Sequence, residues 1–230
     1  MQKILGIIVA VVVGGIAYMV AFKAGGGLFG AGIESKILPD PAVAAGWKKV
    51  EPVGAGYSFH VPDTYTIFDR KDPQLAEIMK EGAKLNPQIE TSVSQIMANE
   101  ALSVMAMDLH NLEAANAGNN INVILIPKKG VVRKKQSELD SFRESMEKET
   151  PPGAKLISVD FVEMPIGTCI RAELTNQIQS VTGPMALRCV SYIAIGKDTM
   201  YDVTYTCQDS AYQSFQPMIL KSMETFRVKG

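Results

Sequence analysis

Apolar and polar residues alternate at the start of the main body of the chain. In GYSFHVP, residues 56–62, aromatic or aliphatic residues occupy every second position, which predicts a half-buried strand. The stretches 101–110 and 120–128 also predict strands, but their apolar residues fall on both parities. Four further strands, separated by turn sequences, are predicted at 155–164, 167–178, 183–195 and 199–207.

Three segments have helical patterns. Residues 74–98 predict a helix in two pieces, because Asn86-Pro87 supplies an N-cap followed by proline at the first helical position. A second helix is predicted to start at Ser137 and to end before Pro151, with an apolar stripe at helical spacing. The last helix is expected from about Ala211 to Phe226.

The two-sided strands and the tight turns together define the expected fold class. A strand that is apolar on both parities needs cover on both faces. Strands joined by tight turns must run antiparallel. The sequence therefore predicts an α+β fold, an antiparallel β-sheet with helices on both faces (an α/β/α sandwich).

The N-terminal segment predicts one transmembrane helix ahead of this fold. Ile4 to Phe22 are 19 residues without a charge, and as a helix they span roughly 28 Å, close to the hydrocarbon core of a bilayer. A cleaved signal peptide remains the alternative, although its apolar region is usually shorter and no good cleavage site follows. The predicted organisation is a signal-anchor at 1–23, a Gly/Pro-rich linker at 24–46 and one domain at 47–230.

The flanking charges and small residues of this segment suggest its orientation and contacts. Lys3 precedes the helix, whereas Lys23 and a Lys36 offset by Glu34 follow it. Positive-inside counting thus favours a single-pass protein of the cell membrane, with its body on the extracytoplasmic, periplasmic side. Small residues form a candidate helix-packing face for self-association or for a partner: Gly6, Ala10, Gly14, Ala17 and Ala21. Such residues are, however, common in membrane helices in general.

Charge and motifs exclude some classes of function. Downstream of residue 36 there are 20 Lys and Arg against 23 Asp and Glu, a balance of −3, which argues against nucleic-acid binding. Gly25, Gly27 and Gly30 match G-x-G-x-x-G, but no strand precedes them, so no nucleotide site is expected. The chain has none of the common hydrolase, metalloprotease or P-loop motifs. We expect no enzyme activity and no cofactor.

Three stretches resemble a known family in their order along the chain: Gly56-Tyr-Ser-Phe-His-Val-Pro62, the meander Gly183–Cys207, and Met218-Ile-Leu-Lys-Ser-Met-Glu-Thr-Phe-Arg-Val228. The pattern is similar to the PsbP-like superfamily, which includes the extrinsic subunit of photosystem II, the Mog-type Ran-binding protein and many bacterial envelope proteins. The resemblance implies an α/β/α sandwich with an accessory or binding role rather than a catalytic one. It assigns no functional residue to this chain.

The cysteines are Cys169, Cys189 and Cys207. If the last hairpin turns over residues 197–199, Cys189 faces Cys207 at a separation that a disulfide can close. A two-residue turn would instead oppose Cys189 to Thr206. Export favours the bond, whereas a cytosolic body favours three buried thiols; Cys169 is free in either case. No Cys-x-x-Cys spacing indicates a metal site.

Two polar features remain as candidate sites. Asp108 and His110 lie two apart on a predicted strand and could form a carboxylate–imidazole pair, although the default interpretation is a pair in solvent at the end of the strand. Five basic residues between a strand and a helix form a candidate patch for an acidic partner or anionic headgroups, or else a solvated loop: Lys128, Lys129, Arg133, Lys134 and Lys135.

Three functional hypotheses follow. The first is a membrane-tethered, non-catalytic accessory module that docks on another envelope protein or complex. The second is a small-ligand-binding domain with a pocket between sheet and helix. The third is an enzyme with an unrecognised site, which would show as a cleft with perturbed titratable groups.

Overall fold

A computed structural model describes residues 33–75, 77–78, 80, 100–109, 119–128, 134–180 and 183–229. The described elements follow one another along the chain as strands, two helices and one short 3₁₀ turn. They are β2 (Trp47–Val50), β3 (Tyr57–Pro62), β4 (Thr66–Asp69), β5 (Leu102–Met107), β6 (Asn120–Pro127), α4 (Gln136–Glu149), β7 (Ala154–Met164), β8 (Gly167–Ser180), β9 (Gly183–Ile195), β10 (Thr199–Gln208), η2 (Asp209–Ala211), α5 (Tyr212–Glu224) and β11 (Arg227–Val228).

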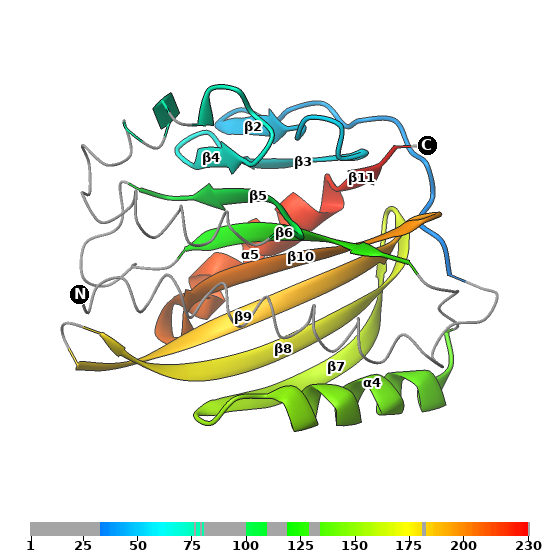
Figure 1. Ribbon diagram of the computed structural model, residues 1–230, viewed down its shortest axis with the longest axis vertical. Coiled ribbons are helices and arrows are strands. Elements are labelled where there is room, and N and C mark those ends of the chain that lie inside the picture. Colours follow the sequence, from blue (N-terminus) through cyan, green and yellow to red (C-terminus); the bar gives the residue numbers. More distant parts are fainter. Residues whose placement is uncertain are drawn as a thin grey trace.

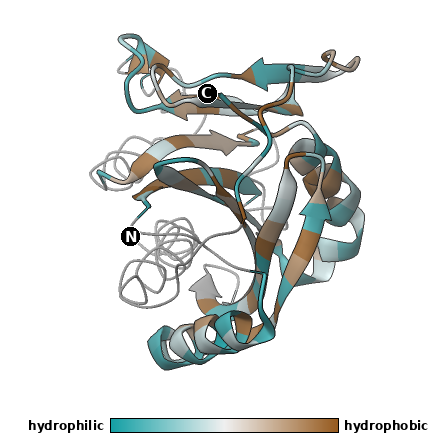
Figure 2. Ribbon diagram, turned by 90° about the vertical axis from the view of Figure 1, so that its right-hand side faces the viewer, coloured by the Kyte–Doolittle hydropathy of each residue, from teal (hydrophilic) through white to brown (hydrophobic). Residues whose placement is uncertain are grey.

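The main sheet has seven antiparallel strands in the order β4-β5-β6-β10-β9-β8-β7, and its strands curve strongly (Figures 1 and 2). Leu139, Phe142 and Met146 of α4 join an apolar cluster on one face. Phe215 and Ile219 of α5 join the cluster on the other. The prediction of an antiparallel sheet with helices on both faces is confirmed.

A second sheet of three strands, β11-β3-β2, stacks against the α5 side through aromatic side chains. Phe226 lies 5.6 Å from the ring of Tyr57 and 5.9 Å from that of Tyr201, measured between centroids. Strand β3 is therefore buried on both faces rather than half-buried, since Ser58 and His60 are also covered, at 1% and 2% exposure. Strands β2, β4 and β11 were not predicted from the sequence.

Residues 33–40 form a strap that lies along the domain, shown in blue at the right of Figure 1. The amide of Ser35 donates to the carbonyl of Ile195 at 2.6 Å, and that of Lys36 donates to Ile166 at 2.6 Å. Further along, Ile37 bridges to β11 and Asp40 accepts a hydrogen bond from Ser58. Of the predicted linker, the described residues thus contact the domain.

The predicted membrane anchor, its small-residue face and most of the predicted helix at 74–98 lie outside the described residues. Within the described part of the chain, no helix combines the length and the apolar character needed to cross a bilayer.

Candidate functional site: a buried carboxylate between two arginines

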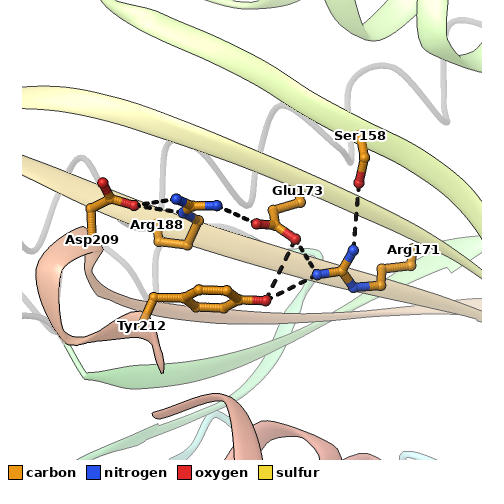
Figure 3. A network of polar contacts seen from close by, with 6 residues as sticks. All are labelled: Ser158, Arg171, Glu173, Arg188, Asp209 and Tyr212. Atoms are coloured by element: carbon orange, nitrogen blue, oxygen red, sulfur yellow. Dashed lines mark hydrogen bonds and ion pairs between the residues drawn. The ribbon is translucent and has the colours of Figure 1, made fainter. Parts of the chain in front are cut away.

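A cluster of charged side chains lies on the α5 side of strands β8 and β9 (Figure 3). Arg171 and Glu173 are two residues apart on β8, so they share one face of the sheet. Arg188 reaches the same place from β9, while Asp209 and Tyr212 arrive from η2 and the start of α5. We call these five residues the arginine cluster.

Glu173 is the centre of the arginine cluster. It is 6% exposed, and each of its carboxylate oxygens accepts a hydrogen bond from a different arginine, Oε2 from Arg171 and Oε1 from Arg188. The hydroxyl of Tyr212 lies 3.5 Å from Oε2. A buried carboxylate is destabilising unless it is paired and hydrogen-bonded, and both conditions are met here.

The two arginines are held on their other sides as well. Arg171 donates to the Tyr212 hydroxyl at 3.0 Å and to the Ser158 hydroxyl at 3.4 Å. Arg188 donates to Asp209 at 2.6 Å, and its guanidinium carbon lies 4.8 Å from the centre of the Tyr212 ring. These contacts fix both guanidinium groups in one orientation.

Burial and neighbouring charges have opposite effects on the pKa values of the two arginines in the arginine cluster. Burial by itself lowers the pKa of Arg188, but the hydrogen bonds and charges of Asp209 and Glu173 outweigh it and raise that pKa. The same balance raises the pKa of Arg171, where Glu173 and Tyr192 oppose the burial. Burial, reinforced by Glu173, raises the pKa of Tyr212. The arginines are therefore fixed positive charges.

The arginine cluster reaches the molecular surface. The side chains of Arg171 and Arg188 are 18% and 20% exposed, and that of Asp209 is 33% exposed. Asp160 on β7, which pairs with Arg171 in the sheet register, is exposed beside them. The arrangement can hold and orient a bound group. Among the described residues, no three His, Cys, Asp or Glu side chains gather so as to hold a metal ion.

The sequence did not identify the arginine cluster as a site. Its signal was present as charges inside otherwise apolar strands, Arg171 and Glu173 in GTCIRAELT and Arg188 in GPMALRCV. A charge at such a position requires a partner. Arg171 and Glu173 are two residues apart, but Arg188 is 15 residues from Glu173 and Tyr212 is 41 residues from Arg171.

The structure corrects the predicted disulfide. The amide of Gly196 donates to Thr199 at 2.8 Å and closes a two-residue turn, so Cys189 pairs with Thr206 and Cys207 with Arg188. Neighbouring positions on a strand point to opposite faces. Cys189 therefore lies in the α4-side cluster and Cys207 in the α5-side cluster, and both thiols, like that of Cys169, are free.

We expect the native protein to resist thiol reagents at pH 8. The three cysteines are 1–2% exposed, and burial raises the pKa of each thiol to about 12, so almost no reactive thiolate forms. Mass spectrometry after maleimide treatment should find no adduct on the native chain and three adducts in guanidinium without reductant. One adduct in guanidinium would show that Cys189 and Cys207 are bonded after all.

The predicted basic patch is only partly described, because Lys129 and Arg133 lie outside the described residues. Lys128 is paired within the domain, donating to Glu34 at 2.9 Å and to the carbonyl of Gly196 at 2.9 Å. Lys134 forms an ion pair with Glu163 at 2.5 Å, and Lys135 is exposed at the start of α4.

The predicted Asp108–His110 pair lies only partly within the described residues. Asp108 is buried at the end of β5, whereas His110 lies outside them. His60, the other histidine, is buried, its backbone is hydrogen-bonded to Ser222 and Thr225 at the end of α5, and burial lowers its pKa.

A second polar group of side chains lies on the α4 side, at the centre of the main sheet. Asp202 on β10 is 0% exposed, and its Oδ1 accepts hydrogen bonds from Ser191 and Thr204. Its Oδ2 and the Oδ1 of Asn122 on β6 have no partner among the described residues. Burial raises the pKa of Asp202 to about 6. In the described part of the chain, these two acceptors at the centre of this face are therefore unsatisfied.

Comparisons with known proteins give structural neighbours only. No family model matches the sequence, and no curated protein matches it. The cyanobacterial PsbP (CyanoP) of Synechocystis sp. PCC 6803 is similar over 86% of this chain and 95% of its own, with 12% identity and a TM-score of 0.46. The Ran-binding protein Mog1p of Saccharomyces cerevisiae is similar over 79% of this chain and 95% of its own, with 12% identity and a TM-score of 0.44.

LpqN, which is involved in cell envelope biogenesis of Mycobacterium tuberculosis, is similar over 86% of this chain and 87% of its own, with 9% identity and a TM-score of 0.34. The neighbours thus include PsbP and Mog1 proteins, as the resemblance in the sequence suggested. At such low similarity they carry no residue roles to this chain, and its function must be inferred from its own side chains.

Proposed function

We propose that this protein is a non-catalytic accessory module, held at a membrane by residues 4–22, that docks on a partner protein through the arginine cluster. The observation that carries the proposal is the pair of surface arginines, Arg171 and Arg188, which are already fixed by Glu173, Asp209 and Tyr212. Arginine and tyrosine are the residue types that most often dominate the energy of protein interfaces.

Preorganisation makes this surface suited to docking. Ordering a flexible side chain at an interface costs about 0.5–1.5 kcal/mol. The guanidinium groups of Arg171 and Arg188 are each held by more than one contact before any partner arrives, so this cost has already been met in folding. Complementary charges then contribute mainly to specificity and to the rate of association.

The charges of the arginine cluster indicate the kind of partner. Two arginines face two carboxylates, those of Glu173 and Asp209, so the cluster is close to neutral. Interspersed charges match a protein surface that carries both signs, rather than a polyanion. The balance of −3 downstream of residue 36 agrees with this choice.

Purification of the full-length chain from its native membranes in mild detergent tests the proposal. We expect a stoichiometric partner with the wild-type chain and at least a tenfold loss of that partner with Asp160→Arg, which places an unmatched charge beside Arg171. Asp160 is exposed, but it lies opposite Arg171 across the sheet, so the like charge should lower the stability by at most about 1 kcal/mol.

Glu147→Arg is the matched control, since Glu147 is exposed on α4, on the other side of the sheet. It makes the same kind of charge reversal and should leave the partner bound. Removal of residues 1–23 measures separately what the predicted anchor contributes. Equal retention of the partner by both variants, or no partner with the wild-type chain, would rule out docking through the arginine cluster.

The unsatisfied acceptors on the α4 side favour a second candidate function, the binding of a small ligand that donates hydrogen bonds. Asp202 Oδ2 and Asn122 Oδ1 lie on neighbouring strands and face the same side. A set of primary amines tested by thermal unfolding should then raise the melting temperature of the wild-type protein but not that of Asp202→Asn. No shift with the wild-type protein would remove this candidate.

A further inference from the structure

The strap enters the domain close to the predicted anchor. Residues 23–32, ten residues, separate the anchor from Ile33, and fully extended they reach at most about 35 Å. If residues 4–22 cross a bilayer, Ile33 must therefore remain close to its surface.

Hydrogen bonds tie the strap to one end of the main sheet. Ser35 bonds to the last residue of β9 and Lys36 bonds to Ile166, in the turn between β7 and β8. The amide of Lys128, just after β6, donates to Asp198 in the turn between β9 and β10. In Figure 1 this end lies at the right, away from the β8–β9 turn at the lower left. The short tether therefore holds one end of the sheet near the bilayer.

The same end of the sheet is basic. Glu34 has its pKa lowered by a hydrogen bond from Lys128, with Lys197 also near enough to contribute. Glu163 has its pKa lowered by a hydrogen bond from Lys134, and the charge of Lys36 adds to this effect. The lysines at this end outnumber the carboxylates by one: Lys36, Lys128, Lys134, Lys135 and Lys197 against Glu34, Glu163, Asp198 and Glu138 in the first turn of α4. We call this the lysine end.

We propose that the lysine end rests on anionic lipid headgroups of the bilayer that the anchor crosses, and so fixes the orientation of the domain. The inference depends on the membrane tether of the proposed function, but not on the identity of the docking partner. Lys36, Lys135 and Lys197 are exposed and Lys134 is 55% exposed, so these four can reach headgroups. Lys128, 6% exposed, instead fixes the strap through Glu34.

Two physical effects act together in this arrangement. The tether keeps the lysine end at high local concentration beside the membrane, and an anionic leaflet attracts each nearby lysine within about one Debye length. Outside the lysine end the chain is more negative than its total of −1, so the remaining surface is repelled. The arginine cluster, on the α5 side of β8 and β9, then remains available to a partner.

Fluorescence quenching by headgroup-nitroxide lipids tests the orientation in the full-length chain. Pro165→Cys places a label in the turn between β7 and β8 at the lysine end, and Pro184→Cys places one near the β8–β9 turn; both prolines are exposed. Pro184 and Ile195 are eleven residues apart on β9, about 36 Å along an extended strand. The native cysteines are buried, so only the introduced thiol takes the label.

In vesicles of equal phosphatidylglycerol and phosphatidylcholine, we expect at least threefold stronger quenching at Pro165→Cys than at Pro184→Cys. In phosphatidylcholine alone, or with Lys36→Glu, the ratio should fall towards one. Lys148→Glu, at the far end of α4, is the matched charge control and should leave the ratio unchanged. Equal quenching at the two sites in the anionic vesicles, or stronger quenching at Pro184→Cys, would overturn the proposal.

Flotation of the same vesicles separates the inference from the proposed function. A chain that does not float with the vesicles has no membrane tether, and both proposals then fail. A chain that floats but shows no difference between the two labels retains its tether, and only the orientation is wrong.

Discussion

Replacing Glu173 by glutamine is expected to lower the free energy of unfolding by about 2–3 kcal/mol. Removing one partner of a buried ion pair typically costs about 3–5 kcal/mol, and the 18–20% exposure of the two arginine side chains reduces this figure. Glutamine keeps the size of the side chain but leaves two guanidinium groups without their shared carboxylate. Urea unfolding at pH 7, followed by circular dichroism, measures the change.

Glu144→Gln is the matched control for this prediction. Glu144 is exposed on α4, so its loss should change the stability by less than about 0.5 kcal/mol. The double variant Arg171→Met/Glu173→Met should recover part of the loss, because it removes both charges of one pair. A loss below about 1 kcal/mol for Glu173→Gln would mean that the arginine cluster is not held together by its central carboxylate.

Replacing Asp202 by asparagine is expected to stabilise the protein above pH 7, by about 1–3 kcal/mol. Burial raises the pKa of Asp202 to about 6, and each unit by which a folded pKa exceeds the unfolded value costs about 1.4 kcal/mol once the group is ionised in both states. Asparagine retains an acceptor for Ser191 and Thr204 and carries no charge.

The same substitution should change the pH dependence of stability. Because the folded pKa of Asp202 lies above the unfolded value, the folded state holds an extra proton between about pH 4 and pH 6. The contribution of Asp202 to the free energy of unfolding therefore falls as the pH rises through that window and is constant above it. Chemical unfolding of both proteins at pH 4, 5, 6 and 8 should show the advantage of Asp202→Asn growing with pH.

Asp160→Asn controls for the loss of an acidic group as such, since Asp160 is exposed. It should change the stability at pH 8 by less than about 0.5 kcal/mol. A difference between Asp202→Asn and the wild-type protein that does not vary from pH 4 to pH 8 would show that Asp202 has no raised pKa.

The local pattern of apolar and polar residues was sufficient to predict the longer helices and strands. The predicted strand at 183–195 coincides with β9, and the stripe of Leu139, Phe142 and Met146 is the buried face of α4. Long segments repeat their period several times, so the signal is strong. The two-residue strand β11 and the four-residue strands β2 and β4 offer too few repeats and were missed. Their pairing depends on partners elsewhere in the chain.

Whether Cys189 faces Cys207 depends on the length of the turn between β9 and β10, and the two possible lengths differ by one residue. A three-residue turn would place Cys189 opposite Cys207, whereas the observed two-residue turn places it opposite Thr206. The sequence allowed both lengths. The observed turn requires glycine at position 196, since a Cβ there would lie 2.8 Å from the carbonyl of Thr199 and from the Tyr201 ring. Such contacts exist only once the hairpin has folded.

The sequence by itself determined the fold class, because hydrophobic periodicity and tight turns act locally and leave few ways to cover a two-sided sheet. It also placed one uncharged apolar segment, residues 4–22, ahead of the domain. Tertiary structure alone decided which charges meet. Register brought Arg188, and the start of α5 brought Tyr212, to the Arg171–Glu173 pair on β8, and the strap brought Glu34 to Lys128. Such pairs depend on distances between strands and turns, which no local pattern encodes.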